Sequence, residues 1–229
     1  MYFERTFRVG ARDVDPFGQC RPSSMMSFLQ EAATSAAVAL GVSREEMIRR
    51  YNVFWMVARI WYQLDKPVRW DEEITIRTWH RANKGASMYR DFDLYRDGER
   101  IGEAVSVWVL ADLDTHKLFR LGDVSEFEGT GGGERPLHYS DADVNGHVNN
   151  TRYSDFACDA LHMQRLGNGN FVSSLQIGYL KECRPGETIR LSTGYGDGVW
   201  YVQGDGAEGK ARFDAALTLT PLDDPPPGA

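Results

Sequence analysis

Apolar residues recur along this chain with the spacing of a helix, and the same spacing returns in the second half. From Met25 to Ala33 they fall at i, i+3, i+4, i+7 and i+8, which is one face of an α-helix. From Tyr153 to Leu161 the spacing is the same, and the two sets correspond at an offset of 128 residues. One helix near the start of each half is therefore predicted.

Stretches of alternating apolar and polar residues follow each predicted helix and indicate β-strands. They cover residues 54–64, 74–79, 88–95 and 101–111 in the first half, and 172–181, 188–195, 199–203 and 211–220 in the second. Asp97-Gly98 predicts a hairpin between two of them. The strands align at a shorter offset, 115 residues, so the first half is expected to carry 13 extra residues around 43–52.

A helix followed by antiparallel strands, present twice, predicts an α+β fold in which each sheet curls over its own helix. The glycine-rich residues 126–134 have no periodicity and are interpreted as a linker. It separates an N-terminal unit, residues 1–125, from a C-terminal unit, residues 135–221. The proline-rich residues 222–229 are expected to form a disordered tail.

Composition and charge narrow the class of protein. The net charge of −7 argues against a general nucleic-acid-binding role, which needs a basic surface. Three cysteines without a close pair favour neither a disulfide scaffold nor a zinc site, and no other metal-ligand or cofactor motif is evident. No signal peptide and no run of about 20 apolar residues is seen. We expect a cytoplasmic protein that does not span a membrane.

The loop from Asp143 to Asn150 carries the most informative polar residues. At the offset of 128 residues Asp143 corresponds to Asp15, but Asn145 is matched by Phe17 and His147 by Gln19. One copy thus keeps polar groups that can transfer protons, and the other has lost them. This one-sided loss favours a single functional site in the second half.

The same loop leads directly into the second predicted helix, with Asn149 or Asn150 as its N-cap. A helix N-terminus offers unpaired N–H groups and the positive end of the helix dipole, which can stabilise an oxyanion. In the alternative interpretation Asp143 and Asn145 only form a turn, and His147 is an ordinary half-buried histidine. Residues that served only the turn should be present in both copies, but the first copy has lost Asn145 and His147. We therefore favour a functional role for them.

A second candidate cluster is Glu182-Cys183, whose counterpart in the first half is Pro67-Val68. Glu182 can act as a general base or as the partner of His147. Cys183 can act as a nucleophile if it is held as a thiolate, or it can simply pack in the core.

The motifs Asp143-Val-Asn145-Gly-His147-Val-Asn-Asn and Glu182-Cys183, in a duplicated chain, resemble those of the acyl-ACP thioesterase family. The resemblance implies a tandem (double) hotdog fold. It also implies hydrolysis of fatty acyl-acyl carrier protein without a cofactor, which releases the fatty acid and terminates fatty acid synthesis. Asp143, Asn145, His147, Glu182 and Cys183 match the catalytic set of the family. The N-terminal unit would then shape the acyl pocket. We expect a monomer with an internal pseudo-dimer, or a homodimer.

The resemblance leaves the mechanism and the substrate carrier open. In one route water attacks the thioester with Glu182 or Asp143 as base, His147 and Asn145 position the reactants, and N–H groups of residues 147–150 hold the oxyanion. A Cys183 acyl-enzyme is the other route. An acyl-CoA thioesterase and a non-catalytic sensor of acyl thioesters remain as alternatives. Two basic pairs are candidates for docking the carrier protein: Arg81 with Lys84, and Lys181 with Arg184.

Overall fold

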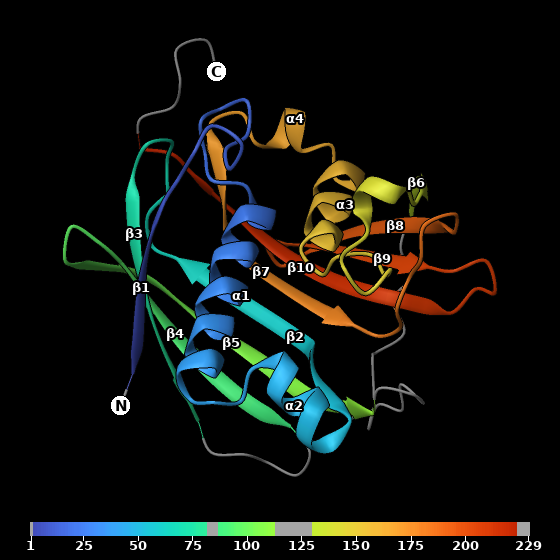
Figure 1. Ribbon diagram of the computed structural model, residues 1–229. Coiled ribbons are helices and arrows are strands. Elements are labelled where there is room, and N and C mark those ends of the chain that lie inside the picture. The colour runs from blue at the N-terminus through green and yellow to red at the C-terminus, as the bar shows by residue number, and fades with distance from the viewer. Residues whose placement is uncertain (1, 82–86, 113–129, 224–229) are drawn as a thin grey trace.

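Figure 1 shows the computed structural model, which describes residues 2–81, 87–112 and 130–223. In this part of the chain ten strands form one antiparallel sheet: β1 (Phe3–Arg8), β2 (Val53–Leu64), β3 (Glu73–His80), β4 (Met88–Arg96), β5 (Glu99–Asp112), β6 (Thr130–Pro136), β7 (Asn170–Tyr179), β8 (Thr188–Gly196), β9 (Val199–Asp205) and β10 (Ala211–Pro221). The helices are α1 (Pro22–Ala39), α2 (Arg44–Tyr51), α3 (Arg152–Ala160) and α4 (Met163–Leu166), with a 3-10 turn, η1, at Tyr139–Asp141.

The order of the strands makes the duplication visible. The first half runs β1-β3-β4-β5-β2 and the second continues β7-β10-β9-β8-β6, so each strand mirrors its counterpart about the centre. At the centre β2 pairs with β7, from Arg59 opposite Gly178 to Gln63 opposite Ser174. The two predicted sheets are therefore joined edge to edge into one, and the duplicated α+β arrangement is confirmed.

Helices α1 and α3 lie against the same face of this sheet (Figure 1), and they contact each other. The buried face of α1 includes Phe28, Leu29 and Ala32, and that of α3 includes Phe156 and Ala157. Alanines on both buried faces allow the helices to approach their neighbours closely. Among the described residues no single helix is long and apolar enough to cross a membrane. Helices α1 and α2, bent by 53° at their junction, meet the length and composition criteria only when taken together.

The predicted linker is wrong for its second part. Residues 130–134 belong to β6, which pairs with β8 at the edge of the sheet; residues 126–129 lie outside the described residues. Glycine is needed here, because a Cβ on Gly132 would lie 3.1 Å from the Leu191 carbonyl oxygen and Gly133 has a φ of 93° at a bulge. An edge strand that packs by backbone contact leaves no apolar pattern in the sequence.

The extra residues of the first half and the chain end are also placed. Part of the segment around residues 43–52, where extra residues were expected, forms α2, a helix that was not predicted. The predicted tail is wrong at its start: Leu222 is buried, and its N–H donates to the carbonyl of Gly169 (2.9 Å). Residues 224–229 lie outside the described residues.

Candidate active site

The site lies where the two halves of the sheet separate. Beyond Arg59 and Gly178 the strands β2 and β7 no longer pair, and a pocket of ≈ 670 Å³ opens between them. Most of its apolar lining comes from the first half, and most of its charged and amide side chains come from the second. The apolar lining includes Phe54, Trp55, Met56, Val107 and Val109.

Four of the five predicted site residues line this pocket: Asp143, Asn145, His147 and Glu182. His147 Nε2 lies 3.4 Å from Glu182 Oε2. The two side chains are 13% and 28% exposed, so the pair is shielded yet still reached by water. An imidazole beside a carboxylate in an accessible pocket is suited to proton transfer.

The loop that carries Asp143 has a structural copy in the first half. In both copies the aspartate N–H donates to a carbonyl four residues ahead, and its carboxylate accepts from the N–H two residues ahead. The bonds are Asp143 N to His147 O and Asp15 N to Gln19 O (both 2.8 Å), and Asn145 N to Asp143 Oδ1 (2.8 Å) and Phe17 N to Asp15 Oδ1 (2.9 Å). The carboxylate of Asp143 therefore has a turn-forming role that both halves require.

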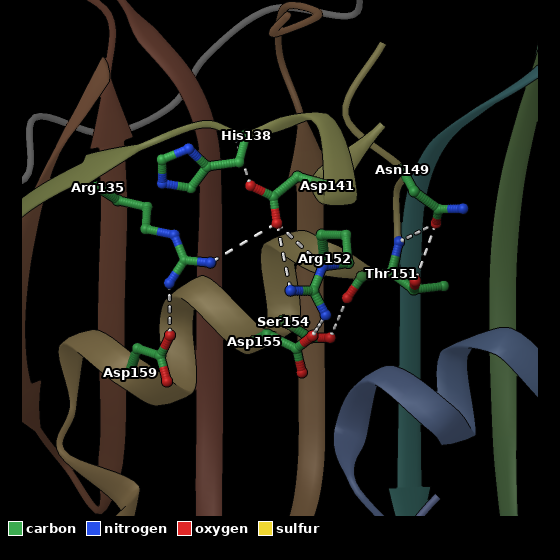
Figure 2. Close-up of polar contacts among 9 residues, drawn as sticks. All are labelled: Arg135, His138, Asp141, Asn149, Thr151, Arg152, Ser154, Asp155 and Asp159. Carbon is green, nitrogen blue, oxygen red and sulfur yellow. Dashed lines mark hydrogen bonds and ion pairs between the residues drawn. The ribbon is translucent and has the colours of Figure 1, made fainter. Parts of the chain in front are cut away.

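A buried carboxylate outside the pocket fixes the start of this loop (Figure 2). Asp141 is 1% exposed and accepts hydrogen bonds from the N–H of His138 (2.8 Å) and from Arg152 Nη2 (3.2 Å), with Arg135 Nη2 at 3.6 Å. Its carbonyl accepts from the Asn149 N–H (2.8 Å). This residue was not among the sequence candidates, although it has a counterpart: Asp13 accepts from the N–H of Gly10 (2.9 Å).

The start of α3 differs from the prediction by one or two residues. Thr151 is the N-cap, whereas Asn149 and Asn150 precede the helix. The side-chain oxygen of Asn149 accepts from the Thr151 N–H and hydroxyl, both at 2.9 Å (Figure 2). Of the N–H groups expected to hold an oxyanion, those of Val148 and Asn149 donate to the carbonyls of Cys183 and Asp141. Asn150 is among the residues that line the pocket.

Cys183 differs from the other predicted site residues in its burial. Its exposed fraction is 0%, and it is absent from the described residues that line the pocket. Its thiol hydrogen-bonds with the Tyr153 side chain, and burial raises the pKa of the thiol, which disfavours a nucleophilic thiolate. The structure thus places Cys183 in the core behind the site.

Cys183→Ala is accordingly expected to retain most of the wild-type kcat on an acyl thioester. Removal of a true nucleophile lowers kcat by roughly 10⁶-fold in a serine hydrolase, so the two roles give very different results. Steady-state kinetics together with a thermal unfolding curve would separate them. Near-complete loss of turnover in a folded variant would instead support an acyl-enzyme.

Other side chains at the pocket have defined partners. Trp55 lines the pocket, and its indole N–H donates to the Val42 carbonyl (2.9 Å). Arg81 forms an ion pair with Asp91, and Lys84 lies outside the described residues. Lys181 lines the pocket, and Arg59 and Lys210, which sequence patterns did not single out, line it as well. Among the described residues no group of three or more histidine, cysteine, aspartate or glutamate side chains is placed to hold a metal ion.

Comparisons with known proteins agree with this architecture. Residues 1–125 match the model of the acyl-ACP thioesterase N-terminal domain, and residues 133–217 match that of the C-terminal domain. The fold is similar to a solved acyl-ACP thioesterase from Bacteroides thetaiotaomicron, with a TM-score of 0.85 and 21% identity over 96% of this chain and 98% of that one.

Two curated relatives are chloroplastic. A dodecanoyl-acyl-carrier-protein hydrolase of Umbellularia californica is 24% identical over 84% of this chain and 59% of its own length. A palmitoyl-acyl carrier protein thioesterase of Gossypium hirsutum is 24% identical over 86% of this chain and 56% of its own length. This chain thus spans less than two thirds of the length of either relative. With both domain models matched in order along nearly its whole length, the chain belongs to the acyl-ACP thioesterase family.

Proposed function

We propose that this protein hydrolyses the thioester of fatty acyl-acyl carrier protein, releases the free fatty acid and so terminates fatty acid synthesis. One observation carries the proposal: His147, Glu182 and Asn145 line one pocket that is also lined by apolar residues of β2 and β5. Such a pocket suits an acyl chain with a reactive group at its head. The family and the names of the relatives support the same substrate class.

In the mechanism that we propose, Glu182 takes a proton from water as the water oxygen bonds to the thioester carbonyl carbon. The tetrahedral intermediate then expels the thiol as the carbon–sulfur bond breaks, and the proton on Glu182 returns to the departing sulfur. His147, 3.4 Å from Glu182, orients the carboxylate and the water. Asp143 is the weaker candidate for the base, since its carboxylate is used in the turn.

The oxyanion needs hydrogen-bond donors that are not already committed to the protein backbone. We assign this role to the side-chain amide of Asn145 and to the N–H of Asn150, which lies on the pocket wall ahead of α3. Tyr179 supports this wall, because its hydroxyl donates to the Asn150 carbonyl (3.0 Å).

The two halves have different roles in this proposal. The unit of residues 1–125 supplies apolar walls from β2 and β5 and shapes the acyl pocket, while the C-terminal unit supplies the catalytic groups. Because one chain forms both sides of its own site, a monomer suffices for activity. We place the protein in the cytoplasm, where acyl carrier protein would meet it.

Basic side chains at the pocket suit an acidic carrier protein with a phosphopantetheine arm. Arg59, Lys181 and Lys210 all line the pocket, although the chain as a whole carries a net charge of −7. Attraction between exposed charges is screened by salt, as the Debye length falls from about 30 Å at 0.01 M to about 3 Å at 1 M. The contribution of carrier-protein docking to kcat/KM should therefore depend on ionic strength.

Purified protein is expected to release fatty acid from dodecanoyl-acyl carrier protein with a higher kcat/KM than from dodecanoyl-CoA. The value for the carrier-bound substrate should fall several-fold as salt rises over that range, because long-range attraction to the acidic carrier is lost. Matched kinetics on both substrates at several salt concentrations provide the test. Preference for the CoA substrate would make the protein an acyl-CoA thioesterase, and tight binding without turnover would make it a sensor.

A further inference from the structure

Helix α2 has no equivalent in the second half of the sequence, yet it reaches the candidate active site. Arg44, its first residue, donates from Nη2 to the side-chain oxygen of Asn145 at 2.7 Å. We propose that Arg44 is a positioning residue, which fixes the Asn145 amide with its NH2 group available to the oxyanion. The inference rests on the proposed function of the site.

The chemistry of the two side chains determines which way the amide faces. A guanidinium has five donors and no acceptor, so only the oxygen of Asn145 can bind it. The NH2 group must then point to the other side, where Asn145 Nδ2 lies 3.4 Å from Asp143 Oδ2. The Asp143 carboxylate, which only accepts, favours the same orientation, but at 3.4 Å this contact is longer than the 2.7 Å bond from Arg44. Loss of Arg44 would therefore remove the shorter of the two contacts that oppose a half-turn rotation, which would present an acceptor where a donor is needed.

Arg44 is itself held in place by its neighbours. Ser43 caps α2 by accepting from the Glu46 N–H (3.3 Å), and the Val42 carbonyl accepts from Trp55 on β2 (2.9 Å). The guanidinium carbon of Arg44 lies 5.9 Å from the centre of the Phe54 ring, within the range of a cation–π contact. Phe54 and Trp55 both line the pocket, so the start of α2 is attached to the wall that it serves.

The inactive copy shows the same position used differently. Phe17, the counterpart of Asn145, meets the segment that follows α3: a Cβ on Gly167 would lie 3.1 Å from the Phe17 ring. In each half, the residue at this point of the loop is thus contacted by the segment that follows the other half's helix. Asn145, an amide, thus meets a charged donor, whereas the Phe17 ring lies against a glycine.

The test compares Arg44→Ala with Arg49→Ala, a control on the same helix whose exposed side chain pairs with Glu46. Arg44→Ala is expected to lower kcat on dodecanoyl-acyl carrier protein by about ten- to a hundredfold with little change in KM, since misplacing a catalytic group costs up to about 10²-fold. Arg44→Lys, which keeps a donor, should recover part of the loss. Arg44→Glu, which offers only acceptors, should be worse than Arg44→Ala. Arg49→Ala should match the wild type in kcat and in melting temperature.

A double-mutant comparison separates positioning from electrostatic attraction. In an Asn145→Ala background, Arg44→Ala should have no further effect on kcat, because both changes remove the same interaction. An effect that persists in that background, or that falls on KM and fades with salt, would overturn the proposal and make Arg44 a carrier-binding residue.

A second readout does not depend on turnover. The Asn145 NH2 resonance, assigned by its loss in Asn145→Ala, should shift in Arg44→Ala and stay unchanged in Arg49→Ala. If the wild type has no thioesterase activity, the proposed function fails while this readout still decides the inference. An Asn145 resonance that ignores Arg44→Ala would refute it.

Discussion

Glu182→Gln is expected to lower kcat on an acyl thioester by about 10²–10⁴-fold, which is the usual contribution of a general base. Glutamine keeps the size of the side chain and its contact with His147 but cannot accept the proton from water. KM should change little, because we expect the acyl chain to lie along the apolar residues of β2 and β5 that line the pocket and not against Glu182. Steady-state kinetics with the carrier-bound substrate measure both values.

The control for this variant is Glu134→Gln, an exposed acid on β6 that is absent from the described lining of the pocket. It should show wild-type kinetics. If Glu182→Gln keeps its activity while Asp143→Asn loses it, the base is Asp143. That residue would then have a catalytic role in addition to forming the turn.

Asp141→Ala is expected to destabilise the fold by about 3 kcal/mol, the lower end of the range for removing one partner of a buried ion pair. The lower end applies because Arg135 and Arg152 are partly exposed, at 27% and 35%, and can regain water. For a chain of this size the melting temperature should fall by roughly 6–12 °C. Activity should fall further than the folded fraction, because Asp141 holds the loop that carries Asn145 and His147.

Asp159→Ala offers a matched comparison, since Asp159 also pairs with Arg135 (2.9 Å) but is 63% exposed. An exposed pair contributes about 0–1 kcal/mol, so its melting temperature should stay near that of the wild type. If both variants lowered the melting temperature by the same amount, the burial of Asp141 would not explain its contribution to stability.

Much of the architecture could be predicted because the central strands are buried on a regular pattern. Strands β2 and β7 alternate apolar and polar residues, and the positive φ angles of Asp97 and Gly98 agree with the hairpin that this pair of residues predicts. Strands β1 and β6 were missed because they lie at the edges of the sheet. Most residues of β1 are exposed, so its position is determined by backbone pairing with β3 rather than by hydrophobic side chains.

The candidate site was predictable to the extent that the two halves differ. Asn145, His147 and Glu182 replace Phe17, Gln19 and Pro67, and they meet in one pocket. The duplication could not separate a turn-forming carboxylate from a catalytic one, since Asp143 and Asp15 form the same turn. It also gave no sign of Arg44, because an insertion has no counterpart with which to compare it. The burial of Cys183 could be seen only in the structure.

In this proposal the thioester is cleaved in the pocket where β2 and β7 separate, and all the catalytic groups come from the second half of the chain. A crystal structure with a dodecanoyl-pantetheine analogue, in which an amide replaces the thioester, tests it most directly. We expect the amide carbonyl beside Glu182 and His147, with the acyl chain along Phe54 and Val109. A carbonyl bound beside Phe17 and Gln19, or an acyl chain bound outside the pocket between β2 and β7, would contradict the proposed site.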